Sequence, residues 1–355
     1  MASTFGKIFK ITSFGESHGK AIGGVIDGCP AGIKIDISEI QKQLNRRRPG
    51  QSQITSQRQE SDKVEFLSGI MDDITLGTPI GFIINNNDAR SSDYESTKSI
   101  YRPSHADFVY EKKYGLRDHR GGGRSSARET AVRVVAGSIA NQIISKQGIS
   151  IKAFVSKVKS LEITKNYFEY NLDKIDNSIV RCPDKDISKK MISLIKDAKD
   201  NGDTLGGEIT CVAENVPVGL GEPVFDKLDA DLAKAMLSIN AVKGIFIGNN
   251  KTEAFGSESN DVLQNLDGKT KTNNSGGIVG GISNGNDIFF NVSFKPVSTL
   301  MQVQDTINDQ GKKTSINPKG RHDPCVLPRA VPIVEAMTAI VLLDHFLINK
   351  TNKIL

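Results

Sequence analysis

The sequence Gly115-Leu-Arg-Asp-His-Arg-Gly-Gly-Gly-Arg-Ser-Ser-Ala-Arg-Glu-Thr130 is followed by an apolar segment that ends at Gly148. Ser126, with Glu129 three residues later, has the pattern of a capping box at the start of a helix. The next apolar residues recur at the spacing of one helical face, and they are Ala131, Val135, Ile139 and Ile143. The pattern predicts a glycine-rich turn that leads directly into the N-terminus of a helix.

This turn is rich in arginine as well as in glycine. Glycine lets the backbone approach a ligand closely, and the first N–H groups of a helix are unpaired and partly positive. The arginines in or beside the turn are Arg117, Arg120, Arg124 and Arg128. Two interpretations are open. One is a surface turn with solvated arginines. The other, which the number of arginines favours, is a site for phosphate or another multiply charged anion.

The composition narrows the function classes. The 355 residues carry a formal net charge of +5 without a long basic run, and they include no tryptophan. These features disfavour a nucleic-acid-binding protein. The four cysteines are far apart and form no CxxC pair, so neither a metal site nor a disulfide framework is expected. We recognise no signal-peptide core and no apolar run long enough to cross a membrane, so we expect a cytoplasmic protein without a membrane partner.

Strand and helix patterns are mixed along the chain. Expected strands cover residues 7–14, 24–27, 63–70, 79–85, 151–163, 207–216 and 287–294. Expected helices begin at Ser38, cover 187–198 and 225–239, and run from Pro332 to about Lys350. The absence of strict βα alternation, and of any marked composition shift, favours a single α+β domain over residues 1–355. Residues 249–274 are polar and predict a long loop, either a lid or a disordered segment.

Two histidines are candidates for proton transfer. His18 lies in a short segment flanked by glycines. Ser104 with Asp107 predicts a helix whose first turn contains His105, where the positive helix end would keep the imidazole neutral. Histidine is suited to protonating a departing phosphate near neutral pH. The alternative for each histidine is a satisfied turn or core residue, and we adopt that interpretation for His345.

Three consecutive arginines, residues 46–48, end the helix that is expected to begin at Ser38. Cations at a helix C-terminus are favoured by the helix dipole alone. Three of them before a Pro-Gly stop exceed that need and favour an anion-binding role. The glycine-rich turns, the arginines and the histidines together suit a small polyanionic substrate that is handled by proton transfer.

The chain resembles the chorismate synthase family along most of its length. Six blocks in the same order carry the resemblance, and together they are far more specific than any one of them. They are Gly15-Glu-Ser-His-Gly-Lys-Ala-Ile-Gly-Gly24, Arg46-Arg-Arg-Pro-Gly50, Tyr101-Arg-Pro-Ser-His-Ala-Asp107, Gly121-Gly-Gly-Arg-Ser-Ser-Ala-Arg-Glu-Thr130, Ser238-Ile-Asn-Ala-Val-Lys-Gly244 and Gly320-Arg-His-Asp-Pro-Cys325. The resemblance implies a lyase that converts 5-enolpyruvylshikimate 3-phosphate to chorismate and phosphate. The reaction is an anti 1,4-elimination that needs reduced FMN but shows no net redox change.

The resemblance also implies roles for individual residues. His18 would protonate the departing phosphate, His105 would serve the reduced flavin, and Asp323 would help the flavin N5 region to act as the base for the C6 proton. The expected FMN contacts are Arg124, Ser125, Ser126, Asn240, Ala241, Gly280, Lys295, Pro296, Val297, Ser298, Thr299 and Arg321. The candidates for binding the substrate's phosphate and carboxylates are Arg47, Arg48, Arg128 and Arg321, and these roles rest equally on the arginine clustering.

Three positions depart from the family pattern. Gln53 stands where many relatives have an arginine associated with NADPH contact, so we expect NADPH to act only indirectly, through a separate reductase. Ser104 replaces a usual glycine, and Val297 replaces a usual threonine. The family fold, a sandwich of antiparallel β-sheets around a helical layer, is expected here, as is a homotetramer. Two rivals stay open: an oxidoreductase that uses the flavin pocket for net hydride transfer, and a nucleic-acid-binding module built on the arginine turns.

Overall fold

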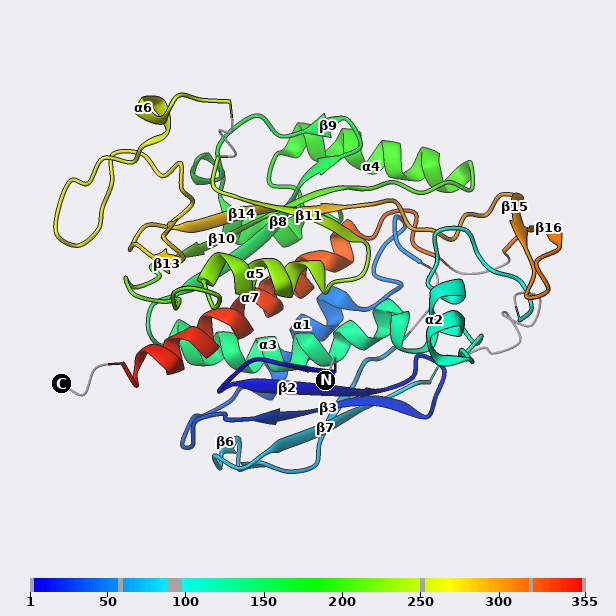
Figure 1. The fold of residues 1–355 in the computed structure, drawn as a ribbon, viewed down its shortest axis with the longest axis horizontal. Coiled ribbons are helices and arrows are strands. Elements are labelled where there is room, and N and C mark those ends of the chain that lie inside the picture. Colours follow the sequence, from blue (N-terminus) through cyan, green and yellow to red (C-terminus); the bar gives the residue numbers. More distant parts are fainter. Residues whose placement is uncertain (1–2, 57–59, 88–97, 250–252, 319–321, 353–355) are drawn as a thin grey trace.

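The fold is a sandwich in which a layer of helices lies between two antiparallel β-sheets (Figure 1). The computed structural model describes residues 3–56, 60–87, 98–249, 253–318 and 322–352. The strands of the first sheet, in spatial order, are β1 (Thr4–Phe5), β2 (Lys10–Gly15), β3 (Ala21–Asp27), β7 (Ile80–Asn85) and β4 (Val64–Phe66). Those of the second are β11 (Val242–Ile247), β14 (Ile288–Phe294), β10 (Gly207–Glu214), β8 (Ser150–Val158) and β9 (Leu161–Glu162). This architecture confirms the expected fold class.

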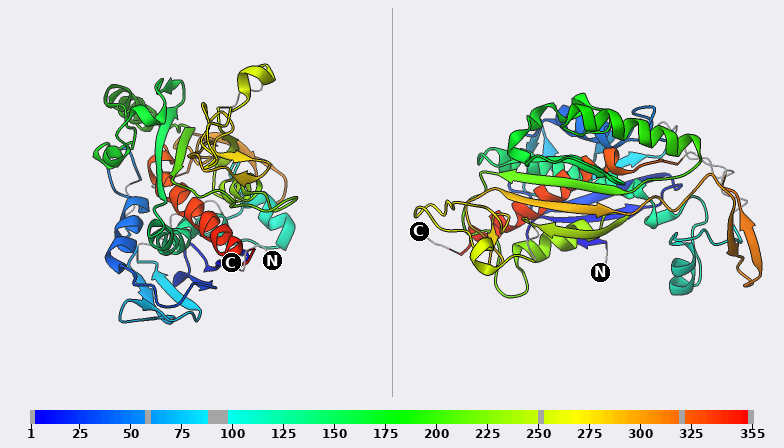
Figure 2. Two further views of the ribbon diagram at one scale, coloured as in Figure 1. Left: turned by 90° about the vertical axis from the view of Figure 1, so that its left-hand side faces the viewer. Right: turned by 90° about the horizontal axis from the view of Figure 1, so that it is seen from above.

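The helices, four 3-10 turns and three short ribbons make up the other described elements. The helices are α1 (Ile37–Arg47), α2 (Asp107–Tyr114), α3 (Thr130–Ser145), α4 (Lys185–Asp200), α5 (Leu228–Leu237), α6 (Gly256–Ser259) and α7 (Leu327–Asn349), with 3-10 turns η2 (Gly123–Ser125), η3 (Ala127–Glu129), η4 (Tyr167–Glu169) and η5 (Leu172–Asn177). Three two-stranded ribbons pair β5 (Ile70–Met71) with β6 (Ile74–Thr75), β12 (Ile278–Val279) with β13 (Ile282–Ser283), and β15 (Gln304–Ile307) with β16 (Lys313–Ile316). In Figure 2, α2 and the β15–β16 ribbon project from one end of the sandwich.

Helix α7 crosses the centre of the helical layer (Figure 1). It is the one described helix that is long and apolar enough to cross a membrane, which corrects the expectation that the chain has no such run. Of the most apolar stretch of this helix, 78% is buried inside the molecule. Packing between the two sheets therefore explains why α7 is apolar on all sides. At Gly137 of α3 an added Cβ would lie 2.3 Å from the Cβ of Ala336, so the backbones of α3 and α7 are in close contact.

The start of α7 differs from the prediction. The helix begins at Leu327, and Pro332, expected as its first residue, lies inside it. A proline within a helix leaves the carbonyl four residues earlier without its N–H partner. Here that carbonyl belongs to Pro328, and the guanidinium of Arg181 donates a hydrogen bond to it. The side chain of a distant residue therefore makes the internal proline tolerable.

The larger elements follow the sequence patterns with three corrections, whereas the ribbons β12–β13 and β15–β16, and α6 inside the expected loop, were not predicted. Helix α1 begins after Asp36, whose carboxylate accepts the N–H of Ser38 at 2.8 Å, so Ser38 is not the cap. Residues 63–70 form only the short β4 and the start of β5. Strand β11 was not expected, because residues 240–244 were interpreted only as a helix break. Most buried residues of both sheets and the helical layer form one continuous cluster, and a small second cluster contains Phe154, Ile175, Val212 and Phe289. The single domain over 1–355 stays a prediction.

Candidate active site

The glycine-rich turn leads into α3 through the two 3-10 turns η2 and η3. The Ser126 hydroxyl accepts a hydrogen bond from the N–H of Arg128 at 3.3 Å, so it caps η3 and not α3. Glu129 does not complete the expected capping box, because its carboxylate pairs with Arg133 at 2.8 Å. The α-helix therefore begins at Thr130, about one turn later than the pattern predicts.

Each glycine of the triplet 121–123 leaves room for one titratable side chain. With the distance to the Cβ that each glycine lacks, the pairs are Gly121 with Cε1 of His18 (2.3 Å), Gly122 with Cε1 of His105 (3.2 Å) and Gly123 with Oε2 of Glu16 (2.4 Å). All three glycines have positive φ, a conformation that L-residues with a Cβ rarely adopt. One turn thus supports both candidate histidines, which come from different parts of the sequence.

A pocket with a volume of about 340 Å³ opens beside this turn, a size typical of small-molecule sites. We call it the histidine pocket. Its lining includes thirteen predicted site residues, namely Arg47, His105, Ser125, Ser126, Arg128, Asn240, Ala241, Lys295, Pro296, Val297, Ser298, Thr299 and Asp323. His18 does not line the pocket. It is 8% exposed and lies behind Gly121, which does.

His105 is held at the edge of the pocket by the segment before α2. The helix begins at Asp107, so His105 precedes it and does not lie on its first turn as predicted. The Nδ1 atom of His105 is 2.9 Å from Oδ1 of Asp107. A carboxylate, and not the positive end of a helix, is therefore the nearest charged influence on this imidazole. Ser104, at the usual glycine position, has a φ of 56°.

Three separate segments, which contain Ser125, Asn240 and Lys295, meet at the pocket wall next to Ser104. The amide of Asn240 donates a hydrogen bond to the Ser125 carbonyl at 2.9 Å, while its buried Oδ1 has no donor within the described residues. Ala241 has a φ of 68°, and its carbonyl accepts the N–H of Lys295 at 2.9 Å. The Lys295 ammonium donates to the Ser298 hydroxyl at 2.5 Å. A ligand that carries an N–H group would satisfy the orphaned Asn240 oxygen.

Asp323 also lines the pocket, and both oxygens of its carboxylate accept hydrogen bonds. One oxygen accepts the N–H of Ser56 at 2.8 Å, and the other accepts a hydrogen bond from the Arg329 guanidinium. The side chain of Asp323 is 11% exposed. His322 also lines the pocket. Arg321 is outside the described residues, so its expected contacts with flavin and substrate stay predictions.

The predicted substrate arginines Arg47 and Arg128 are held by the protein itself. Both are almost fully buried, and both pair with the buried Asp62, Arg47 at 3.0 Å. Arg47 also donates to the carbonyls of Ala127 and Arg128, and Arg128 donates to the Asn86 amide oxygen at 2.8 Å. Burial alone would raise the pKa of Asp62, but the two guanidiniums outweigh it and hold that pKa below its usual range. Arg47 and Arg128 are therefore fixed in position by protein contacts, and we call these two residues the floor of the pocket.

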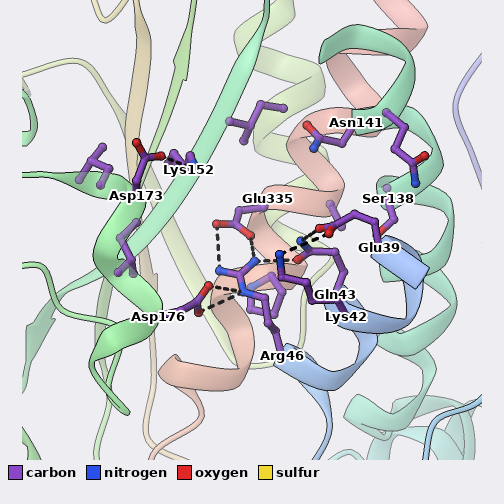
Figure 3. Close-up of a pocket in the computed structure, with 17 residues that line it drawn as sticks. Glu39, Lys42, Gln43, Arg46, Ser138, Asn141, Lys152, Asp173, Asp176 and Glu335 are labelled. Atoms are coloured by element: carbon purple, nitrogen blue, oxygen red, sulfur yellow. Dashed lines mark hydrogen bonds and ion pairs between the residues drawn. The ribbon is translucent and has the colours of Figure 1, made fainter. Parts of the chain in front are cut away.

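The other members of the arginine run are placed differently. Arg46 points into a second cavity of about 280 Å³, where it pairs with Glu335 and with Asp176 at 3.0 Å (Figure 3). We call this second space the ion-pair cavity. Arg48 accepts a hydrogen bond from Gln51 through its carbonyl, and within the described ranges its guanidinium has no hydrogen bond or ion pair. Among residues 46–48, Arg48 alone has a guanidinium without a protein partner in the part of the chain that the structure describes.

The arginines of the glycine-rich turn are also engaged by protein groups. Arg117 pairs with Glu111 at 3.0 Å, and Arg120 with Asp118 at 2.8 Å. Arg124 does not line the pocket, because it donates to the carbonyl of Gly15 at 3.2 Å and to Ser13 on β2. The turn therefore does not present a ring of free guanidiniums, which the sequence pattern had favoured.

Gly280 is not brought to the histidine pocket by this chain. It lies in the turn between β12 and β13, at the end of the molecule opposite α2 (Figure 1). The expected lid segment is at that same end, where the described residues 253–274 include α6. Within one chain, this segment does not cover the pocket, and a flavin contact by Gly280 stays a prediction.

Comparisons with known proteins agree with this arrangement. The family model described as chorismate synthase matches residues 9–347. The chain belongs to the chorismate synthase family. Chorismate synthase of Christiangramia forsetii is 60% identical over 354 residues, and that of Parabacteroides distasonis is 58% identical over 355 residues, each covering 99% of both chains. A crystal structure of chorismate synthase superposes with a TM-score of 0.77 at 30% identity, covering 97% of this chain and 93% of that one.

The structure shows residues in and behind the histidine pocket that the sequence did not single out. Asp62 holds two arginines, Arg329 holds Asp323, and Arg102 holds Asp107 through two bonds of 2.7 and 2.8 Å. Asp107 was recognised only as a helix-cap signal. Its spacing of two residues from His105 was the available clue to this contact, whereas nothing in the sequence around Asp62 indicates a buried ion pair.

Proposed function

We propose that the histidine pocket carries out the anti 1,4-elimination of phosphate from 5-enolpyruvylshikimate 3-phosphate with reduced FMN bound. Membership of the chorismate synthase family gives the reaction class, that of a lyase in the last step to chorismate. A proton leaves C6, the C–H electron pair shifts into the ring, and the C3–O bond to phosphate breaks. Atoms and charge balance without an external oxidant or reductant.

One observation carries the proposal: thirteen of the predicted site residues, drawn from six separated segments of the chain, line a single pocket. The donors and acceptors there suit a flavin. The orphaned Asn240 oxygen would accept a ring N–H, and Ser125, Ser298 and Lys295 would surround the remaining polar atoms. When bound, reduced FMN would supply an electron-rich ring that eases the departure of phosphate without net redox change.

The histidines would manage the protons. His105 presents its free edge at the pocket wall and would serve the reduced flavin, while His18 would donate a proton to the departing phosphate. Because His18 lies behind Gly121 and does not line the pocket, its proton would reach the phosphate through a bridging water molecule. Asp323, held by Arg329 and the Ser56 N–H, would direct the base that accepts the C6 proton.

Substrate anions would be attracted by cationic groups of two kinds. Arg47 and Arg128 would supply fixed positive potential from the floor, because Asp62 neutralises only one of their two charges. Arg48, which is uncommitted in the described structure, would be able to move onto a phosphate or carboxylate. The ammonium of Lys295 lies on the same pocket, where burial and the neighbouring Lys243 lower its pKa.

The wider setting follows from the same proposal. We expect a cytoplasmic homotetramer that binds neither nucleic acid nor membrane. NADPH would act only through a separate reductase, because Gln53 replaces the arginine associated with its contact. The side chain of Lys199 already donates to the Gln53 carbonyl at 2.8 Å, so this position is occupied by a protein contact.

The test is an anaerobic phosphate-release assay with the enolpyruvyl substrate. We expect release with reduced FMN and none with oxidised FMN, while the flavin absorbance before and after turnover is unchanged. A flavin absorbance that changes in step with product would indicate the oxidoreductase instead. No phosphate release under either condition, with folded protein, would contradict the proposal. Salt-sensitive retention of DNA or RNA would support the nucleic-acid rival.

A further inference from the structure

His105 has two ring nitrogens in different surroundings. Nδ1 lies 2.9 Å from Oδ1 of Asp107, whereas the Cε1–Nε2 edge lies over Gly122, with Nε2 3.5 Å from the Cβ position that this glycine leaves empty. The side chain of His105 is 18% exposed, and that of Asp107 only 2%. The imidazole therefore has one edge fixed in the protein and one edge toward the pocket.

Asp107 is held in place more firmly than a helix-cap residue requires. Arg102 donates to its Oδ2 from Nε at 2.7 Å and to its Oδ1 from Nη2 at 2.8 Å, and the Arg102 N–H adds a bond of 3.2 Å. The guanidinium of Arg117 is 3.3 Å from Oδ1. Burial alone would raise the pKa of Asp107, but the hydrogen bonds from Arg102 and His105 outweigh it and keep the carboxyl ionised.

An ionised carboxylate can only accept hydrogen bonds. The nitrogen of His105 that faces it must therefore carry a proton, and in the neutral ring the lone pair is then on Nε2. We infer that Asp107 is a positioning residue that fixes the His105 tautomer and turns Nε2 toward the pocket, where that atom would exchange a proton with the reduced flavin. The catalytic part of this inference rests on the proposed function, whereas the tautomer does not.

The alternative is that Asp107 only ties α2 to the segment before it. Both roles predict some loss of stability when the carboxylate is removed, so stability does not separate them. The tautomer of His105 does separate them, because a tie between helix and loop places no requirement on the proton of an imidazole. Glu111 offers a matched control: it contacts Arg117 and Tyr101 in the same network but not His105.

The experiment uses the full chain with ¹⁵N-labelled histidines and no flavin. Long-range ¹H–¹⁵N NMR spectra at about pH 8.5, where an ordinary imidazole is neutral, report which nitrogen carries the proton. The His105 signals are assigned by their loss in His105→Gln. In the wild-type chain we expect the Nδ1–H tautomer. In Asp107→Asn, where the amide no longer enforces that proton, we expect mixed tautomers, and in Glu111→Gln the wild-type pattern.

Phosphate release with reduced FMN gives the second readout. We expect Asp107→Asn to lower kcat about tenfold to a hundredfold with little change in KM, and Glu111→Gln to stay within about twofold of wild type. An Nε2–H tautomer in the wild-type chain would overturn the inference, and this measurement does not depend on the folding of any variant. A kcat of Asp107→Asn within twofold of the wild-type value would also overturn the inference. If the wild-type chain released no phosphate, the proposed function would fail while the tautomer still decided the positioning role.

Discussion

The histidine pocket and the ion-pair cavity are both built at the C-terminal end of α1, yet only one of them has the features of an active site. In the ion-pair cavity the charged groups neutralise one another: Arg46 pairs with Glu335, and Lys152 with Asp173 at 2.9 Å. Of the residues that line it, none has a positive φ. This cavity is polar, but the charges of Arg46 and Lys152 are already paired with carboxylates.

The histidine pocket differs in its backbone and in its titratable groups. Its lining includes Ser104 and Ala241 with φ of 56° and 68°, and it contains His105 beside the glycine turn. Residues held in sparsely populated conformations are typical of functional sites. A buried amide oxygen without a donor is found in both spaces, at Asn141 and at Asn240, so that feature alone does not identify an active site. The strained backbone and the histidine together distinguish the histidine pocket from the ion-pair cavity.

The largest expected effect tests whether the floor of the histidine pocket is as structural as the ion-pair cavity. Asp62→Asn leaves Arg47 and Arg128 buried without their common carboxylate. We expect the free energy of unfolding to fall by roughly 3–5 kcal/mol, as found when one partner of a buried ion pair is removed. Urea unfolding at neutral pH measures it, and a loss below about 1 kcal/mol would mean that the pair is not a structural element.

The pH dependence of the same variant supplies the control. Because the pKa of Asp62 is lowered in the folded chain, its stabilisation is fully present above the unfolded pKa of about 4 and is lost as pH falls through the lower folded value. The difference in stability between the wild-type chain and Asp62→Asn should therefore shrink below about pH 4. A difference that stays constant there would contradict the assignment of the effect to the ionised carboxylate.

The next effect concerns activity and sharpens the contrast between the two spaces. His105→Ala and His18→Ala should each lower turnover about a hundredfold or more, equivalent to about 2.7 kcal/mol in the activation barrier. Both chains should keep the wild-type circular dichroism spectrum. The phosphate-release assay with anaerobic reduced FMN measures the loss, and wild-type rates in both variants would show that these histidines are not the proton-transfer groups.

The matching change in the ion-pair cavity should affect stability without affecting activity. Glu335→Gln removes one of the two carboxylates that pair with Arg46, while Asp176 remains. We expect a loss of roughly 1–3 kcal/mol in the free energy of unfolding and an unchanged kcat at 25 °C. Parallel urea unfolding and phosphate-release measurements check both parts. A fall in kcat of tenfold or more would break the division between the two spaces.

The smallest effect tests the backbone of the histidine pocket. Ser104→Gly should relieve the left-handed conformation, which costs about 1–2 kcal/mol for a residue with a Cβ, at the expense of about 0.5–1 kcal/mol of chain entropy. The net gain of about 0.5 kcal/mol would raise Tm by about 1 °C. The Ser104 carbonyl, which accepts from Ser298 at 2.8 Å, is kept in the variant. A lower Tm would mean that the serine hydroxyl contributes more than the strain costs.

Part of this picture was predictable from the sequence. Local signals predicted α3, α5 and most strands of both sheets, because periodicity and turn residues act over short distances. The family resemblance named residues 295–299 and Asp323, which line the pocket together with residues from the quoted blocks. The same signals did not predict that Arg47 would point into the protein while Arg48 remains uncommitted, since neighbouring arginines in a helix end differ only in the direction that the fold gives them.

The misses share a physical origin in side-chain contacts, some of them between residues far apart in the sequence and some between near neighbours. Pro332 was expected to begin a helix, and only the Arg181 side chain, which satisfies the Pro328 carbonyl, shows why the helix runs through it. The arginines of the glycine-rich turn were expected to be available to an anion, yet acidic residues close by in the sequence, such as Asp118, pair with them. Side-chain partners of this kind are determined by the tertiary fold, so patterns of residue type do not reveal them.

The support that the glycine triplet gives to both imidazoles has a consequence for how variants combine. A displacement of these three residues would change the space left for both His18 and His105, so the positions of both rings depend on this turn. Substitutions at the triplet and at either ring are therefore thermodynamically coupled, and their effects will not add. The positions of the two imidazoles therefore depend on the space that is open because Gly121 and Gly122 have no Cβ atoms.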